Sequence, residues 1–393
     1  MKQNSTKGPL NKSILRILFG FAFILGISRN AAGPLTPIFV EEFNIGYDTM
    51  GFIFFLGVFS GMVSIIILGR LSDSIGRKSV LLIASGLIML GTAGIIFSNT
   101  VVIFIISYSV INCGFAGIET GVTLGAADVS GSKKAGALNS VFKFDSIGGF
   151  LAPSILFIII FLEQSWRIFF IMILALSIII SIILFYMNYP SHAATGQRQR
   201  FSLKDILDPV ILLGSAVLIF SNGVIVQFAA WFTTYFLEFG IQVQYSSLVV
   251  SLYWLSMLLG RLILQRFLAR FEERKIFFAI TLIAMLAMFT IAFTGNIWVK
   301  VVFSFILGLS VSGIYPILFS IILSRKPGMM GGIYSFLGFT GYSTIMLYQL
   351  LTGLIAENLG KGYVIFVQLG SSVMVFILTI FLIKASIRAG KQA

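Results

Sequence analysis

The sequence predicts an all-α membrane protein in which twelve transmembrane helices form two pseudo-symmetric six-helix bundles. Three observations predict this class: the composition, a series of apolar segments long enough to cross a bilayer, and one polar stretch that divides them. Of the 393 residues, 58% are hydrophobic and only 10% are charged. Because one span needs about 20 apolar residues, little of the chain is left for a soluble catalytic domain, which excludes water-soluble enzymes.

The basic residues test the number of spans. Lysine and arginine collect in the cytoplasmic loops of membrane proteins. If the segments alternate across the bilayer, 22 basic residues, Arg261 among them, fall on one side, and only Arg167, Lys300 and Lys361 fall on the other. We therefore expect both termini in the cytoplasm, and the net charge of +13 reflects topology rather than nucleic-acid binding. The predicted spans are 14–40, 47–69, 78–97, 100–127, 136–162, 166–187, 209–237, 245–268, 276–295, 298–323, 329–356 and 363–386.

A polar stretch in the middle of the chain predicts the domain organisation. We expect an N-terminal bundle at 1–187, a cytoplasmic linker at 188–208 and a C-terminal bundle at 209–393. The tripeptide Gly-Arg-Leu at 69–71 recurs at 260–262, 191 residues later. Internal repeats of this kind are typical of secondary transporters.

The loop after the second predicted span carries a motif. Residues 69–78 read Gly-Arg-Leu-Ser-Asp-Ser-Ile-Gly-Arg-Lys, which resembles the signature G-x-L-[AS]-D-x-x-G-R-[KR] of the major facilitator superfamily. Asp73 can interact with a helix terminus, and Gly76 permits a tight turn. The resemblance implies the major facilitator fold and a motif that controls its conformational change, formed by Gly69, Asp73, Gly76, Arg77 and Lys78.

Shorter stretches resemble the fucose permease-like sugar:proton symporters of the same superfamily. They are found at 117–120, 138–153, 251–254, 260–261 and 313–316, together with Trp231. The resemblance implies that Glu119 is the helix 4 carboxylate that couples transport to protons. Where these symporters have an acid before a proline in helix 1, this chain has Gly33 before Pro34, and Arg29 lies one turn earlier. This departure leaves the sugar and the coupling route open.

Apart from the charged residues assigned to the two sides of the membrane, four ionisable residues lie within the predicted spans: Arg29, Glu119, Lys143 and Asp145. A charge near the bilayer centre is unfavourable by about 3 kcal/mol or more, so it is retained beside a partner or a water-filled cavity. We expect Glu119 to face Arg29 and to carry the proton, with Asp145 as a further member of the coupling group. Lys143 and Asp145 are about 200° apart around a helix. One of the two is therefore expected to face the cavity, and we favour Lys143.

Polar and aromatic residues in the spans are the candidates for substrate binding. Amides can bind the hydroxyl groups of a sugar, and an aromatic ring can cover its apolar face. Asn112 lies two helical turns before Glu119 and is expected on the same face. The predicted substrate-binding residues are Asn30, Asn112, Lys143, Asn222, Gln227, Trp231, Tyr253, Trp254, Tyr315, Tyr342 and Gln349.

These features favour a transporter that imports a sugar or sugar acid by alternating access with a proton. A proton-coupled antiporter that exports a drug or metabolite and an organic anion transporter are the alternatives. An enzyme is not expected, because catalytic motifs are absent from the sequence, and Cys113 and His192, each the only residue of its kind, exclude an internal disulfide and a zinc site. We expect no cofactor, with sodium as an alternative coupling ion. The expected partners are a small-molecule substrate and membrane lipids in the plasma membrane, without nucleic acid, and the expected oligomeric state is a monomer.

Overall fold

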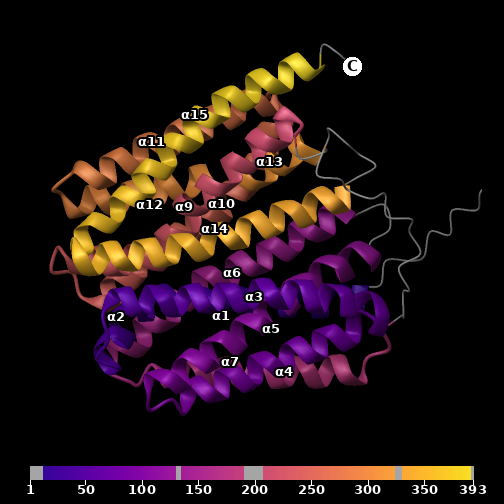
Figure 1. The fold of residues 1–393 in the computed structure, drawn as a ribbon, viewed down its shortest axis with the longest axis vertical. Helices are drawn as coiled ribbons and strands as arrows, with labels where there is room; N and C mark the ends of the chain where they lie inside the picture. Colours follow the sequence, from indigo (N-terminus) through magenta and orange to yellow (C-terminus); the bar gives the residue numbers. More distant parts are fainter. Residues whose placement is uncertain (1–11, 130–133, 190–206, 324–329, 391–393) are drawn as a thin grey trace, which may run out of the picture.

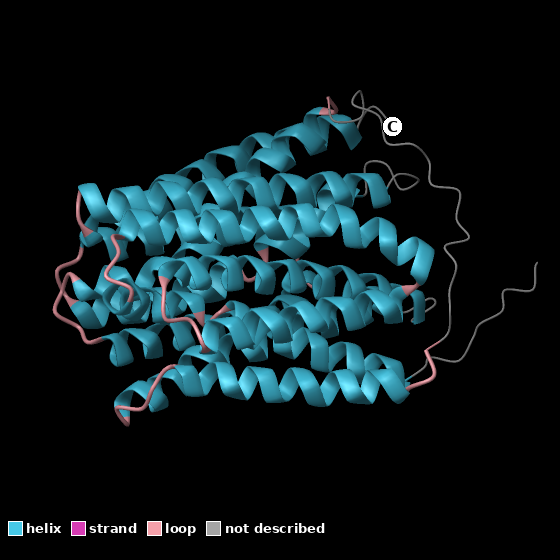
Figure 2. Cartoon of the chain, turned by 60° about the horizontal axis from the view of Figure 1, so that its bottom comes forward, coloured by secondary structure: helices cyan, strands magenta, loops and turns pink. Residues whose placement is uncertain are grey.

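The computed structural model describes residues 12–129, 134–189, 207–323 and 330–390, and within these ranges it is helical without strands (Figure 2). Figure 1 shows the helices running roughly along one direction, so that their ends gather at two ends of the molecule. We call the end where the first helix starts and the last helix finishes the terminal end, and the opposite one the far end. The helices of the first half are α1 Lys12–Arg29, α2 Ala32–Glu42, α3 Tyr47–Ile75, α4 Arg77–Ile96, α5 Val101–Val129, α6 Lys134–Phe161 and α7 Arg167–Tyr186. Those of the second half are α9 Pro209–Leu237, α10 Val243–Leu268, α11 Glu273–Phe293, α12 Ile297–Val311, α13 Ile314–Leu323, α14 Met330–Asn358 and α15 Val364–Gly390, with a 3₁₀ turn, η3, at Lys361–Tyr363.

The helices confirm the predicted all-α membrane fold. In the described residues, ten are long and apolar enough to cross a membrane, and the bent pair α1 and α2 brings the number to eleven. The remaining predicted span corresponds to α14, which is 29 residues long but does not belong to that apolar group. Its sequence carries Tyr342, Tyr348 and Gln349, and polar residues of this kind are typical of helices that line a transport path.

Two of the predicted spans are broken, and a proline explains each break. Proline has no N–H group to bond the carbonyl four residues earlier, and its ring clashes with that carbonyl. Pro34 lies four residues after Asn30, where α1 ends and α2 begins at an angle of 41°. Pro316 lies four residues after Ser312, where α12 gives way to α13. The sequence predicted continuous helices at both places.

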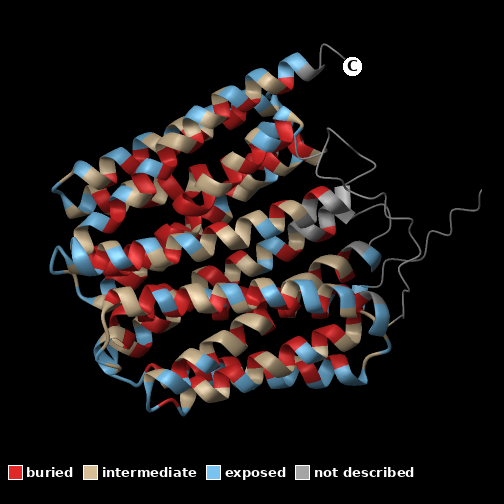
Figure 3. Ribbon diagram, viewed as in Figure 1, coloured by how far each residue is buried: buried red, intermediate tan, exposed pale blue. Residues whose placement is uncertain are grey.

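Each half packs internally, and the two halves meet along three pairs of helices. In the first half α4 and α3 pack on α5, and α1 packs on α6. In the second half α15 packs on α9, and α10 and α11 pack on α12. The halves meet where α3 runs along α14, α6 along α10 and α2 along α9 (Figure 1). Buried residues gather on the inner sides of the helices and exposed residues on the outer sides (Figure 3), as expected for a bundle whose outer apolar surface faces lipid.

Contacts between the halves close the far end. A Cβ atom on Gly51 of α3 would lie 2.8 Å from the carbonyl oxygen of Gln349 and 2.9 Å from Cα of Gly353, both on α14. The backbone N–H of Tyr47, at the first residue of α3, donates to a carboxylate oxygen of Glu357 at 2.7 Å. At the terminal end, by contrast, a Cβ on Gly338 of α14 would meet nothing within 4 Å. The two helices are therefore closely packed at the far end.

Candidate functional site

Three side chains from three helices meet at the boundary between the halves. Arg29, the last residue of α1, donates from Nη2 to Oε2 of Glu119 on α5 at 2.8 Å. The hydroxyl of Tyr342 on α14 donates to the same carboxylate oxygen at 2.7 Å. We call these residues the charged triad. Glu119 thus contacts its own half through Arg29 and the other half through Tyr342.

The charged triad lines an open space rather than a sealed core. The side chain of Arg29 is 41% exposed and that of Glu119 is 36% exposed. Neither residue is at the surface that faces lipid, because Tyr342 approaches from the opposite half. Among the described residues, no group forms a hydrogen bond with the second carboxylate oxygen of Glu119, Oε1. That oxygen is therefore available to a proton or to water.

Asn112 shares a hollow with Arg29. The hollow is lined by Ser28, Arg29, Ala32, Phe39, Ile95, Tyr108, Ile111, Asn112, Phe115 and Phe170. The amide nitrogen of Asn112 donates to the carbonyl of Tyr108 on its own helix at 2.8 Å. The amide of Asn30, at the break between α1 and α2, bonds back to the carbonyl of Gly26 at 2.8 Å.

On α6, Asp145 interacts electrostatically with two arginines and with Glu119. The charges of Arg29 and of Arg261 on α10 both act on Asp145. Lys143 is half-buried, and no hydrogen bond or ion pair joins it to another described residue. The sequence analysis favoured Lys143 over Asp145 for the cavity, and this choice stays a prediction.

Two cations of the second half lie inside the bundle, where the sequence analysis expected only neutral groups. Arg261, assigned to a loop, belongs to α10, and its Nη1 donates to the carbonyl of Phe142 at 2.8 Å and to the hydroxyl of Ser146, both on α6. Lys300, also assigned to a loop, is 1% exposed in α12. Its amine donates to the hydroxyl of Tyr235 and to the carbonyl of Ile291, each at 2.6 Å. Lys300 lies in the first turn of α12, and Arg261 lies about two turns before the end of α10. Counting basic residues on each side of the membrane does not separate such positions from loops.

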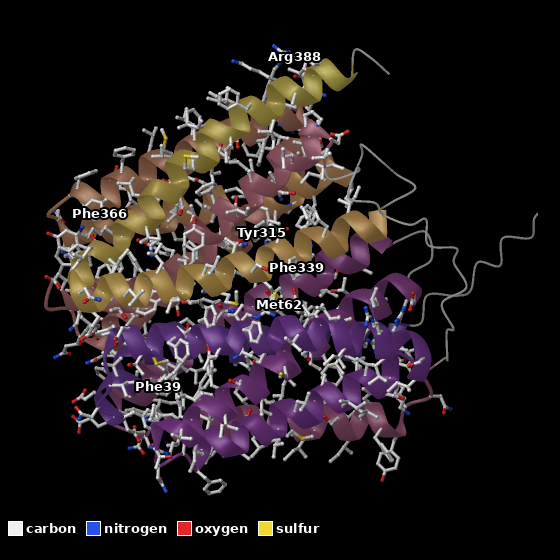
Figure 4. All side chains as sticks on the ribbon, viewed as in Figure 1. Phe39, Met62, Tyr315, Phe339, Phe366 and Arg388 are labelled. Atoms are coloured by element: carbon white, nitrogen blue, oxygen red, sulfur yellow. The ribbon has the colours of Figure 1, made fainter. Side chains whose placement is uncertain are left out.

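Polar residues of the second half form a cluster beside the charged triad. The hydroxyl of Tyr315, just after the break between α12 and α13, donates to the amide oxygen of Asn222 on α9 at 2.5 Å. The amide nitrogen of Asn222 donates to the carbonyl of Gly341, the residue before Tyr342, at 3.2 Å. The broken helix, α9 and α14 are therefore connected next to Glu119. Figure 4 shows Met62 of α3 and Phe339 of α14 on facing sides of the boundary, where the hydroxyl of Ser343 lies 3.4 Å from the sulfur of Met62.

The remaining predicted binding residues are sealed within the second half. The indole of Trp231 donates to Oε1 of Gln349 at 2.7 Å. Gln227 is fully buried, and its Oε1 accepts a bond from Thr352 at 3.4 Å. The hydroxyl of Tyr253 donates to the carbonyl of Ile225 at 3.2 Å. In this conformation these four residues hold α9, α10 and α14 together, and all four are buried.

Trp254 is the exception, because it lies at the boundary between the halves. It is 9% exposed and packs against α6 at Gly149. Its indole nitrogen is buried without a hydrogen-bond partner among the described residues. Buried N–H groups are usually paired, so this one is a candidate donor to a ligand that enters from the boundary.

The loop motif forms a compact polar cluster at the terminal end. Gly76 has φ of +86°, a conformation that favours glycine, between α3 and α4. Nε of Arg77 pairs with Asp128 of α5 at 3.1 Å, and its Nη1 donates to the hydroxyl of Ser72 at 2.6 Å. The sequence analysis did not include Asp128, because it lies 51 residues after its partner. The side chain of Asp73 lies outside the described residues, and a Cβ on Gly69 would meet nothing within 4 Å.

The same cluster ties α4 to α7. The amine of Lys78 donates to the carbonyls of Phe185 and Met187, each at 2.8 Å. Lysine near the end of a helix commonly bonds the last carbonyls in this way. Burial, together with the nearby charge of Asp128, raises the pKa of Tyr189, just beyond α7, to about 12.

Comparisons with solved structures support the same architecture. The chain is similar to a D-xylose-proton symporter (TM-score 0.77, 14% identical, 94% of this chain and 96% of the other). It is also similar to the nucleoside transporter NupG (TM-score 0.76, 14% identical, 94% and 99%) and to the transporter FucP in its outward conformation (TM-score 0.64, 17% identical, 94% and 98%).

Comparisons of sequence identify the family. A protein named TsgA homolog from Buchnera aphidicola subsp. Baizongia pistaciae is 24% identical over 364 residues, 89% of this chain and 91% of the relative. A second TsgA homolog, from Buchnera aphidicola subsp. Schizaphis graminum, is 22% identical over 381 residues, 94% and 95% of the two chains. The family model of the Major Facilitator Superfamily matches residues 18–349 and 238–392. With nearly the whole chain matched, the protein is a transporter that belongs to the Major Facilitator Superfamily.

Proposed function

We propose that the protein imports a small polar solute, a sugar or sugar acid, by alternating access together with a proton that Glu119 carries. One observation carries this proposal: Glu119 is bonded at the same time by Arg29 of its own half and by Tyr342 of the other half. Glu119 can gain or lose a proton, and it also contacts both halves. A group with both properties can couple the binding of a proton to the movement of the halves.

The coupling follows from the charge of Glu119. The ionised carboxylate makes charge-assisted hydrogen bonds with Arg29 and Tyr342, and these bonds are stronger than bonds between neutral groups. A proton on Oε1 removes the charge and weakens both contacts, so α14 can separate from α5. Conversely, moving α14 away removes one bond that stabilises the ionised form. Protonation and the position of α14 are therefore linked, and each changes the other by the same free energy.

Polar side chains beside the charged triad support a polar solute. Asn112 shares a hollow with Arg29, and Tyr315 and Asn222 lie next to Tyr342 on the other side of the boundary. The solved transporters of similar fold are named for D-xylose, fucose and nucleosides. Amides and hydroxyls are suited to ligands rich in hydroxyl groups, because each polar atom of the ligand needs a partner.

The contacts at the far end and the basic residues in the loops at the terminal end together support an assignment of the side of the membrane to which the protein is closed. The excess of basic residues in the loops at the terminal end supports a cytoplasmic position for that end, by the positive-inside rule. The far end, which the contacts of Gly51 and Tyr47 with α14 close, then faces the outside of the plasma membrane. In this assignment the described conformation is closed to the outside.

Uptake by the purified protein in proteoliposomes tests the function. An inward pH gradient should drive labelled sugars or sugar acids above their external concentration. Glu119→Gln should abolish accumulation against a gradient but retain exchange of solute for solute, because the amide cannot release a proton. Glu41→Gln, an exposed acid at the end of α2, is the matched control and should behave like the wild type.

The other outcomes of this experiment distinguish between the alternative functions. Normal accumulation by Glu119→Gln contradicts the role of this residue in coupling. Movement of the solute against the direction of the proton supports an antiporter. Absence of flux for every solute contradicts the transport proposal itself.

A further inference from the structure

Two arginines from opposite halves flank the centre of the site, and the second of them was expected in a loop. Arg29 belongs to α1 and Arg261 to α10, and the charges of both act on Asp145 of α6. Together with α5, these three helices bring together two cations, Arg29 and Arg261, and two acids, Glu119 and Asp145. With all four ionised, the central group is electrically neutral.

The guanidinium of Arg261 has unused donors. Its Nη1 serves both the carbonyl of Phe142 and the hydroxyl of Ser146, whereas Nη2 reaches only the sulfur of Met257, at 3.7 Å. No oxygen acceptor among the described residues bonds to Nη2 or Nε. The side chain is half-buried at the boundary between the halves. These two nitrogens form the planar fork that binds a carboxylate with two parallel hydrogen bonds.

Arg29 is also only partly used. One of its nitrogens bonds Glu119, and 41% of its side chain is exposed. If a proton neutralises Glu119, the charge of Arg29 is no longer balanced within the charged triad. The site then has a net charge of about +1, which is unfavourable inside a membrane protein. A substrate that carries one negative charge restores neutrality.

Resting on the proposed function, we propose that the substrate is a monoanion with a carboxylate, of the sugar-acid class, which Arg261 and Arg29 bind and which enters together with one proton on Glu119. The empty carrier and the carrier loaded with both ions are then neutral, and only the carriers with one of them are charged. Charged intermediates are disfavoured in the low-dielectric interior, so the proton and the anion bind cooperatively. A neutral sugar with a proton would leave the loaded carrier with a net positive charge.

The groups that face Glu119 support this charge balance. Arg29 faces it from α1, Asp145 acts from α6 and Tyr342 bonds it from α14, while Tyr108 lies on its own helix near Arg29. The charged residues of α3 and α4 that the structure describes, among them Asp48, Arg70 and Arg77, lie near the ends of those helices. They are therefore too distant to replace Arg29 or Asp145 in the balance.

Matched pairs of ligands provide the test. Thermal-shift titration of the full chain in detergent compares glucuronate with glucose, galacturonate with galactose, and gluconate with sorbitol. We expect at least one acid to bind about ten-fold or more tightly than its neutral partner. Arg261→Gln should remove that preference, and Arg261→Lys should keep part of it, because lysine retains the charge but not the fork. Arg266→Gln, an exposed arginine on the same helix, should leave binding unchanged.

Transport in proteoliposomes gives a second, independent readout. Uptake of the preferred acid should proceed at the same rate at membrane potentials of either sign set by a potassium gradient and valinomycin. The inference is overturned if no acid binds more tightly than its neutral partner, if folded Arg261→Gln and Arg261→Lys both keep the preference, or if uptake carries current. Uptake of a neutral sugar with a proton would overturn this inference and leave the proposed function intact, whereas absence of all flux would contradict the proposed function.

Discussion

Gly51→Ala should shift the protein toward conformations that are open at the far end. The added Cβ would lie 2.8 Å from the carbonyl oxygen of Gln349 and 2.9 Å from Cα of Gly353, where ordinary contacts lie at 3.4–4 Å. Both neighbours are backbone atoms of α14, so no rotation of a side chain relieves the clash. Overpacking of this kind costs about 1–3 kcal/mol. The helix propensity gained by replacing glycine applies in every conformation in which α3 is helical, and therefore cancels from the comparison.

The expected shift can be worked out from this cost. Because about 1.4 kcal/mol corresponds to a factor of ten in an equilibrium constant, the ratio of far-open to far-closed molecules should rise about 5-fold to 150-fold. Gly338→Ala is the control, because it makes the same substitution on α14 at a position where the Cβ meets nothing within 4 Å. Its distribution of conformations should match that of the parent protein.

Distances between spin labels measure this shift. Asn99, in the loop before α5, and Leu359, just after α14, are exposed at the far end on different halves. With Cys113 replaced by serine and cysteines introduced at these two positions, pulsed electron resonance gives the distribution of distances between the halves. Gly51→Ala should enlarge the population with long distances. Equal distributions for Gly51→Ala and Gly338→Ala, or a shift toward short distances, would refute the assignment of this contact as the closure of the far end.

Two further substitutions test local features. Asn296 accepts hydrogen bonds from the N–H groups of Trp298 and Val299 at the start of α12, so Asn296→Ala should reduce the free energy of unfolding by about 1 kcal/mol. The midpoint of thermal unfolding in detergent should fall while uptake stays unchanged. An unchanged midpoint would contradict the role of Asn296 as a helix cap. Asp128→Ala removes the ion pair with Arg77, which is 7% exposed, and should reduce stability by about 1–3 kcal/mol. Asp128→Asn keeps an acceptor oxygen and should lose less, and equal losses for the two variants would contradict a role for that oxygen.

The sequence predicted the fold well because hydropathy and the distribution of charge are properties of whole segments. The two breaks were missed, although Pro34 and Pro316 were visible and each break lies four residues before its proline. Proline is tolerated inside membrane helices when neighbouring groups satisfy the freed backbone, and Pro153 lies within the continuous α6. A proline alone therefore does not decide between a kink and a break, and the packing around it does.

The sequence predicts contacts of the site where a charge needs a partner. It does not predict contacts that depend on how a helix is rotated about its axis. The pairing of Arg29 with Glu119 follows from the scarcity of charge within the membrane, since each needs a partner. The choice between Lys143 and Asp145 depends on how α6 is rotated, which local sequence does not fix. Tyr342, which the sequence analysis predicted to bind the substrate, donates to Glu119 in the structure. From the sequence alone, a tyrosine on a polar helix can bind either the substrate or a neighbouring side chain. Only the position of α14 distinguishes these two roles.

The misassigned cations change the chemistry of the site without changing the topology. Arg261 and Lys300 were counted with loops on opposite sides, so moving both into helices leaves the excess of basic residues at the terminal end almost unchanged. The expected contrast between a charged first half and a neutral second half does not hold, because Arg261 reaches α6 across the boundary. Lys300, sealed by Tyr235 and the carbonyl of Ile291, is closed to any solute. Of these two cations in the second half, Arg261 is therefore the one that contacts the first half, and we expect it to supply the second positive charge for the proposed anion.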